Sequence, residues 1–257
     1  MAVSKRLTVA AAGVLIALGT GVALPKAAIA QSTASAVDPA ATAAAQRMRD
    51  YLRSLQSFEV RAQATAEEPL DSGGKVQVSN RVRYEYRAPD RLFAEWQSDR
   101  ELRRLYFDGQ TVSLVAPVVG FYTTVERKGS AAEMLQHISE QYGVVFPLPD
   151  LFLWAWSTAP AENVTAATYV GYASVEGRPA DQFMFTQGDV DWQVWIARGD
   201  QPLPLKLVIT DRSDPTMPSY SAVLKWNVNP TFSDDRFVFT PPSDQTKIEI
   251  VALTGDR

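Results

Sequence analysis

Few side chains in this sequence could do chemistry. The 257 residues include no cysteine and one histidine, His137. The lack of cysteine excludes thiol catalysis, cysteine-ligated zinc, iron–sulfur sites, disulfides and an acylated lipoprotein N-terminus. A metal site that needs two histidines of one chain is excluded as well. A Ser-His-Asp set could form only around His137, which we expect to be an ordinary solvent-facing or hydrogen-bonded side chain, with a pH switch as the alternative.

The remaining polar motifs give little support for catalysis. There are two close acid pairs, Asp189 with Asp191 and Asp234 with Asp235. Asp189 and Asp191 would share a face on a strand, but solvation at a turn is favoured over glycosidase-type acid/base work. Ser72 and Lys75 match an S-x-x-K pattern, but the glycines between them indicate a hairpin turn and not the helix start which that chemistry uses. P-loop, G-x-G-x-x-G and G-x-S-x-G motifs are absent. We therefore expect no enzyme activity, no cofactor and no metal.

The aromatic residues are the better candidates for a binding site. After Asp150 the sequence has no polar face, and this stretch supplies four candidate residues for lining or gating an apolar cavity: Leu151, Phe152, Trp154 and Trp156. Three further candidates fall on the apolar faces of expected strands: Trp96, Trp192 and Trp226. For both groups, ordinary core packing is the alternative interpretation.

Two helices and a long series of strands must position these residues. Asp38-Pro39 predicts a helix start, and apolar residues then recur every three or four positions as far as Phe58. Ser130 and Glu133 form a capping-box pattern before a second helix that ends at Gly143. We interpret residues 130–157 as a helical lid inserted between two groups of strands.

Elsewhere the apolar residues alternate with period two, which is typical of strands with one wet face. The predicted strands cover residues 58–67, 76–86, 91–97, 102–107, 111–115, 121–126, 166–175, 180–186, 190–196, 205–210, 220–226 and a last short one at 237–239. Asp108-Gly109 is the strongest hairpin signal. The pattern predicts a mainly antiparallel α+β fold, in which a curved sheet of about ten to eleven strands forms an incomplete barrel with helices capping its concave apolar face.

The N-terminal residues predict export. A basic start with Lys5 and Arg6, an apolar run over residues 7–24 and the small-x-small sequence Ala28-Ile29-Ala30 indicate a signal peptide, residues 1–30, cut after Ala30. A retained anchor is the alternative. We expect a flexible leader at residues 31–37, a single domain over residues 38–257 and a periplasmic or secreted monomer with no stable membrane insertion after cleavage.

The charge of the mature chain argues against nucleic acid as a partner. The whole chain has 25 basic and 29 acidic residues, and cleavage after Ala30 would remove three of the basic ones, Lys5, Arg6 and Lys26, and no acid. The mature net charge would then be −7. Binding through phosphate neutralisation needs a basic face, so no nucleic-acid partner is expected.

Several sequence stretches carry a family resemblance across nearly the whole mature chain. They are Tyr51-Leu52-Arg53-Ser54-Leu55, Arg87-Ala88-Pro89-Asp90-Arg91-Leu92, Tyr106-Phe107-Asp108-Gly109 and Tyr142-Gly143-Val144-Val145-Phe146-Pro147-Leu148-Pro149-Asp150-Leu151. In these the chain resembles a family of predicted periplasmic proteins of unassigned function within the LolA/LolB-like lipoprotein carrier and lipoprotein-binding superfamily. The resemblance implies a LolA-like half-barrel whose helices close a hydrophobic cavity for the acyl chains of lipids or lipoproteins.

We therefore expect a soluble carrier that holds an apolar ligand between sheet and lid. One alternative is an envelope sensor that reports on lipids through a partner protein. The other is an envelope enzyme without a recognisable motif, which a buried carboxylate or serine beside His137 would favour. No residue role is transferred from the better-known carriers, because no charged residue here matches one of theirs.

Overall fold

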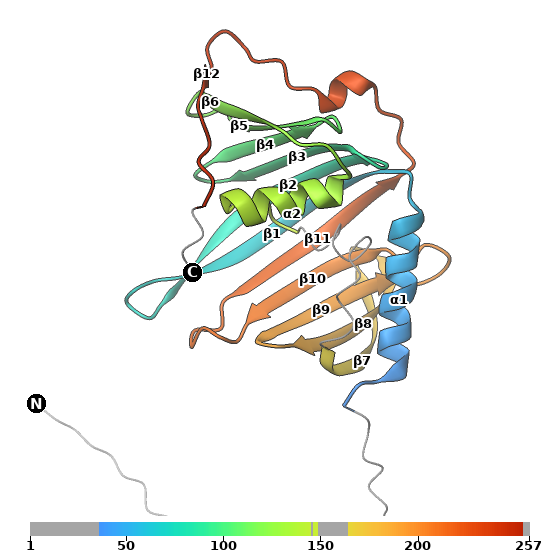
Figure 1. The fold of residues 1–257 in the computed structure, drawn as a ribbon. Coiled ribbons are helices and arrows are strands. Elements are labelled where there is room, and N and C mark those ends of the chain that lie inside the picture. Colours follow the sequence, from blue (N-terminus) through green and yellow to red (C-terminus); the bar gives the residue numbers. More distant parts are fainter. Residues whose placement is uncertain (1–35, 145, 149–163, 254–257) are drawn as a thin grey trace, which may run out of the picture. The chain divides into compact units, whose positions relative to one another are not determined.

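A computed structural model describes residues 36–144, 146–148 and 164–253. Within them, twelve strands form one open sheet, and two α-helices lie over one of its faces (Figure 1). The helices are α1 (Pro39–Ser54) and α2 (Ala131–Tyr142), and a short 3-10 helix, η1, spans Asp234–Phe237. The strands are β1 (Ser57–Pro69), β2 (Lys75–Arg87), β3 (Arg91–Ser98), β4 (Leu102–Phe107), β5 (Thr111–Ala116), β6 (Phe121–Glu126), β7 (Val164–Val175), β8 (Arg178–Gln187), β9 (Val190–Ala197), β10 (Pro204–Asp211), β11 (Ser219–Val228) and β12 (Thr246–Lys247).

The sheet consists of two antiparallel meanders joined at its centre. The strand order is β12-β6-β5-β4-β3-β2-β1-β11-β10-β9-β8-β7. β1 therefore pairs with β2, its neighbour in sequence, and with β11, which lies at the far end of the second meander. Among the twelve described strands, β12 runs parallel to its neighbour β6, and the other pairs are antiparallel. The predicted fold class, a mainly antiparallel sheet that does not close and carries helices on its apolar face, is confirmed, although the described sheet has twelve strands where about ten to eleven were predicted.

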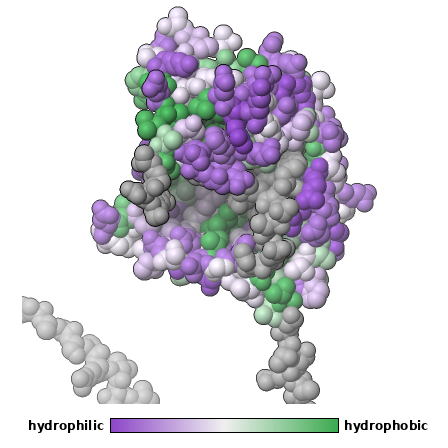
Figure 2. Space-filling model, in the orientation of Figure 1, coloured by the Kyte–Doolittle hydropathy of each residue, from purple (hydrophilic) through white to green (hydrophobic). Residues whose placement is uncertain are grey.

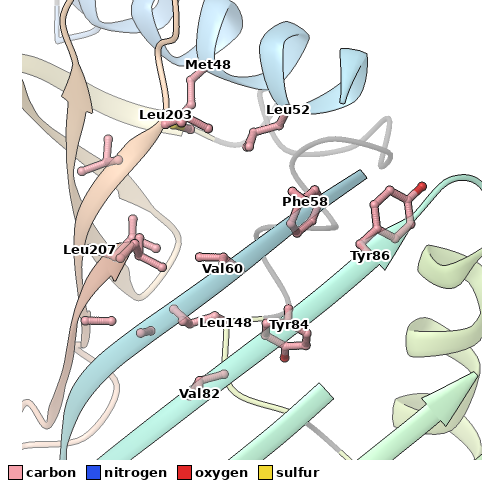
Figure 3. Packing of buried hydrophobic residues seen from close by; sticks show 14 of the residues in the cluster. Met48, Leu52, Phe58, Val60, Val82, Tyr84, Tyr86, Leu148, Leu203 and Leu207 are labelled. Atoms are coloured by element: carbon pink, nitrogen blue, oxygen red, sulfur yellow. The ribbon is translucent and has the colours of Figure 1, made fainter. Parts of the chain in front are cut away.

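The strand alternation builds one apolar face. Along β1, Phe58, Val60, Ala62 and Ala64 are buried, and each pairs with an apolar residue of β11. Figure 3 shows labelled side chains of β1, β2 and β10 together with Met48 and Leu52 of α1. These residues belong to one hydrophobic cluster that spans both meanders.

Helix α1 is capped and attached to β7 at its N-terminal end. The carboxylate of Asp38 accepts a hydrogen bond from the backbone N–H of Ala40 at 2.8 Å, and the N–H of Asp38 donates to the carbonyl of Ala167 on β7 at 2.9 Å. The helix ends at Ser54, because Leu55 adopts an extended conformation. Phe58, which the pattern placed both at the end of the helical face and at the start of the strand 58–67, lies on β1 and joins the same core from the strand.

A second, smaller aromatic cluster covers part of the opposite face. Residues 237–239 do not form the predicted strand. Instead Phe237 ends η1 and is buried, and the ring of Phe239 lies 5.4 Å from Tyr106 and 5.2 Å from Tyr122 between ring centroids. The alternation there resembled a strand because these aromatic residues pack onto the sheet surface without pairing along its edge.

Candidate functional site

The apolar face of the sheet is the candidate site. Short side chains at its centre leave space above the strands. Ala62 and Ala64 of β1 lie beside Leu224 and Ala222 of β11. Figure 2 shows this face hollowed below α2, over the middle strands, with hydrophobic residues on the floor of the hollow. A hollow with an apolar floor favours ligands that lose apolar surface to it, at about 0.8 kcal/mol per buried CH₂.

Helix α2 and the residues after it cover part of this face. The capping box predicted at Ser130 is present: the N–H of Ser130 donates to Glu133 Oε2 at 2.8 Å, and Ser130 Oγ accepts from the N–H of Glu133 at 3.3 Å. Gly143 ends the helix with a φ of 66°, a left-handed conformation that suits glycine. The chain then places Phe146 and Leu148 in the core.

A tyrosine of the sheet holds this covering segment in place. The hydroxyl of Tyr84, on β2, donates to the carbonyl of Pro147 at 2.5 Å. Figure 3 shows Leu148 above β1 and β2, beside Tyr84 and Val82. The start of the predicted lid is therefore attached to the apolar face. Leu151, Phe152, Trp154 and Trp156 lie outside the described residues.

The three other predicted tryptophans all reach the apolar face but are not brought together. Trp96 donates through Nε1 to Asn80 Oδ1 at 2.9 Å, and Trp226 donates to the carbonyl of Pro204 at 2.7 Å. Trp192 stacks on Phe185 with ring centroids 4.0 Å apart. All three are half-buried and pack against the core cluster. The three tryptophans therefore lie at separate places on the apolar face. Their positions agree both with lining a cavity and with ordinary core packing.

An apolar groove of about 300 Å³ opens on the same face near the edge formed by β4, β5 and β6. Its floor includes Leu114, whose cross-strand partner Leu105 is part of the core. Val144 and Phe146 line it from the segment after α2, and residues 248–251 line it from the C-terminal side. Since Phe146 is also a core residue, the groove connects the core with the surface.

An arginine lies beside the groove and next to Trp96. The guanidinium of Arg103 is 5.2 Å from the Trp96 ring centroid, and its Nε is 2.5 Å from Glu101 Oε2. Among the three described tryptophan candidates, Trp96 is therefore the one linked to the groove through a residue of its lining. A cation that lines an apolar groove suits a ligand that has an apolar chain and an anionic or dipolar head.

Burial at the apolar face raises the pKa of two of its tyrosines. Burial raises the pKa of Tyr86 to about 12, and the Asp90 carboxylate adds to this shift. Burial likewise raises the pKa of Tyr220, whose hydroxyl oxygen is enclosed and has no hydrogen-bond partner among the described residues. Both phenols therefore stay neutral at physiological pH, and a charged group would be costly to desolvate at this face.

The polar residues considered for catalysis do not assemble. The ring of His137 lies 5.9 Å from that of Tyr142, and in the described part of the chain it has no carboxylate or serine partner. Asp191 accepts a hydrogen bond from Thr186 at 2.7 Å, whereas Asp189 lies in the turn before β9. Lys75 pairs with Glu67 and not with Ser72. No group of three or more His, Asp or Glu side chains in the described ranges could hold a metal ion.

Sequence reasoning missed the groove and its C-terminal wall. Ile248 and Val251 line the groove while remaining exposed, and the N–H of Ile248 donates to the carbonyl of Tyr122 at 2.8 Å. The alternation of Ile248 and Ile250 with polar neighbours was the available signal. It could not show which edge of the sheet the tail would join.

Comparisons with known proteins give one family and several distant folds. Residues 41–251 match the model of a family described as "Predicted periplasmic protein (DUF2092)". A comparison with the curated proteins found no significant match. None of the described helices is long and apolar enough to cross a membrane.

Three of the similar solved structures illustrate the distance in sequence. LprF from Mycobacterium bovis is 12% identical, with a TM-score of 0.43 over 82% of this chain and 99% of that one. The lipoprotein LppX of Mycobacterium tuberculosis is 16% identical, with a TM-score of 0.37 over 76% and 98%. A LolA superfamily protein from Nitrosomonas europaea is 9% identical, with a TM-score of 0.35 over 77% and 97%.

Proposed function

Because the chain belongs to the DUF2092 family of predicted periplasmic proteins, we propose that it acts in the periplasm and binds an apolar ligand, such as an acyl chain of a lipid or lipoprotein, on the apolar face of its sheet. The observation that carries the proposal is the groove of about 300 Å³, whose apolar lining extends from exposed residues of the C-terminal segment to the buried Phe146. Its volume is at the lower end of the range for ligand pockets, roughly 300–1,000 Å³.

The polar groups near the face also suit such a ligand. In the described part of the chain three charged side chains line the groove, Arg103, Arg104 and Glu249, and Arg103 lies beside Trp96. A ligand with a long apolar chain and a small polar head would match this distribution. Among the described residues no acid, base and nucleophile converge, so no observation there supports the envelope-enzyme alternative.

The site can be located with a brominated fatty acid, which quenches the fluorescence of a tryptophan that it touches. Trp192 and Trp195 lie on β9 three positions apart, so strand alternation turns them to opposite sides of the sheet. Trp192 stacks on Phe185, whereas Trp195 carries the Lys206 ammonium 4.6 Å from its ring centroid. Variants that retain a single tryptophan, with the others changed to phenylalanine, therefore compare the two faces directly.

We expect the brominated fatty acid to quench Trp96, Trp192 or Trp226 in a saturable manner and to leave Trp195 unaffected. Native mass spectrometry of protein from a periplasmic extract would identify the natural cargo. Equal quenching of Trp195, or no saturable quenching of any tryptophan on the apolar face, would contradict the proposal. Retention of ligand without transfer to membranes would favour the sensor over the carrier.

A further inference from the structure

The opposite face of the sheet carries a second, polar groove. Strand alternation places Arg61 and Gln63 of β1 on the side away from the buried Val60, Ala62 and Ala64. Two adjoining hollows of about 460 and 500 Å³ run along this side and share four lining residues, Gln63, Arg81, Gln97 and Val223. Each is large enough for a small polar ligand.

Cations are crowded in the first of these hollows. Arg61 of β1 and Arg83 of β2 are direct cross-strand partners, an arrangement that is unfavourable for like charges. Glu59 Oε1 is shared by the two, at 2.5 Å from the Nε of Arg61 and 3.0 Å from the Nε of Arg83, and Arg83 also pairs with the buried Glu85. Lys225 adds a further positive charge from β11.

The acids that line the same hollow already have partners. Glu95 is 2.7 Å from the Nε of Arg104, and Glu176 is 3.1 Å from the Nζ of Lys225. Arg81 differs from the other cations, because its guanidinium donates to Gln97 Oε1 at 3.0 Å and has no carboxylate partner in the described part of the chain. The groove therefore has a guanidinium available for an anion, on a chain whose overall charge is negative.

The second hollow continues from Arg81 with uncharged hydrogen-bonding groups. Its lining is composed mainly of amides and hydroxyls, with one acid at its far part; it includes Gln63, Thr65, Ser79, Gln97, Ser221 and Asp99. Amides and hydroxyls both donate and accept hydrogen bonds, which suits a ligand rich in hydroxyl groups. A planar guanidinium suits a phosphate or carboxylate, which it can bind through two parallel hydrogen bonds.

We propose that this groove binds an anionic saccharide, whose phosphate or carboxylate is held by Arg81 and whose hydroxyls lie along the amide and hydroxyl lining. The site is separate from the apolar face, because it uses the side chains on the other side of the same strands. It is independent of the proposed lipid binding, and either can fail without the other.

Titration of the labelled protein with glucose 6-phosphate and with glucuronate, followed by NMR at low salt, tests the site. We expect saturable shifts at Gln63, Arg81 and Gln97 with at least one of the two, and a dissociation constant about tenfold or more higher in Arg81→Gln. The matched control is Arg178→Gln, an exposed arginine at the start of β8, which should leave binding unchanged. Thermal unfolding would verify that both variants fold.

The two probes distinguish the source of the charge, since binding of only one assigns the site to phosphate or to carboxylate. Neutral glucose is the reference for the charge itself. The proposal is overturned if neither anion gives saturable shifts at these residues, if glucose binds as well as the anions, or if Arg178→Gln weakens binding as much as Arg81→Gln.

Discussion

Glu67 links two turns of the sheet through one oxygen. Its Oε2 accepts hydrogen bonds from the Lys75 ammonium, from Ser219 N–H and from Ser219 Oγ, each at 2.9 Å. These hydrogen bonds lower the pKa of Glu67 from its ordinary value of 4.5, and the bond from Lys75 has the largest effect. A carboxylate bound in this way stabilises the fold only while it is ionised.

The sign of the resulting pH dependence follows from the lowered pKa. The stabilisation is fully present above the unfolded-state value of 4.5 and is lost as the pH falls through the lower folded-state value. We expect Glu67→Gln to lower the melting temperature at neutral pH, and the difference from the unmodified protein to shrink as the pH falls below 4.5. Melting curves over this range measure it. The control is Glu68→Gln, which removes an exposed partner of Arg100. If Glu67→Gln lowered the melting temperature by the same amount at every pH, this interpretation of Glu67 would be contradicted.

A buried acid on the polar face shows why single residues there matter. Glu85 has 1% of its side chain exposed and pairs with both Arg83 and Arg236. The guanidinium of Arg236 lies 3.7 Å from the centroid of the buried Phe93 ring. One glutamate thus ties β2 to η1 and to the aromatic cluster, a role that could not be inferred from its place in an alternating strand.

At the scale of elements, α2 matters because it sets where the covering segment begins. Its buried side chains are Ala131, Met134, Leu135 and Ile138, and the chain after Gly143 lines the groove. A helix of this length is marginal on its own and depends on its caps and its packing. The capping box at Ser130 should therefore influence both stability and the groove.

We expect Ser130→Ala to lower the free energy of unfolding by about 1 kcal/mol, because the N–H of Glu133 loses its side-chain acceptor. Chemical denaturation measures this change. Ser139→Ala inside the same helix is the matched control and should be neutral or slightly stabilising, since alanine favours helix interiors. If both substitutions had the same effect, the cap would contribute nothing.

At the scale of the whole molecule, the predicted export signal decides which chain reaches the periplasm. Residues 1–30 carry the basic start, the apolar run and the small residues of a cleavage site. We expect the protein recovered from a Gram-negative periplasm to begin at Gln31, as intact mass and N-terminal sequencing would show. Ala28→Asp together with Ala30→Asp should block cleavage and leave the longer chain with the membrane fraction. A full-length chain in the soluble periplasmic fraction would refute the signal-peptide interpretation.

Local sequence pattern was sufficient for most elements and for the two faces of the sheet. Period-two alternation predicted eleven of the strands to within a few residues, and the Ser130–Glu133 pattern predicted the start of α2. These features depend on backbone geometry over a few neighbouring residues, because side chains alternate across any strand and caps act within one helical turn.

Only the tertiary structure decided how distant segments combine. Three contacts join residues more than a hundred positions apart: β1 pairs with β11, η1 packs over Glu85 and Phe93, and the C-terminal segment borders the groove. Many such pairings would satisfy the same alternation, and the burial of one continuous apolar face selects among them. Trp96, Trp192 and Trp226 could therefore be assigned to a face from the sequence. The groove beside Trp96, and the place of Arg81 beside Gln97 without a carboxylate partner among the described residues, depend on which strands become neighbours.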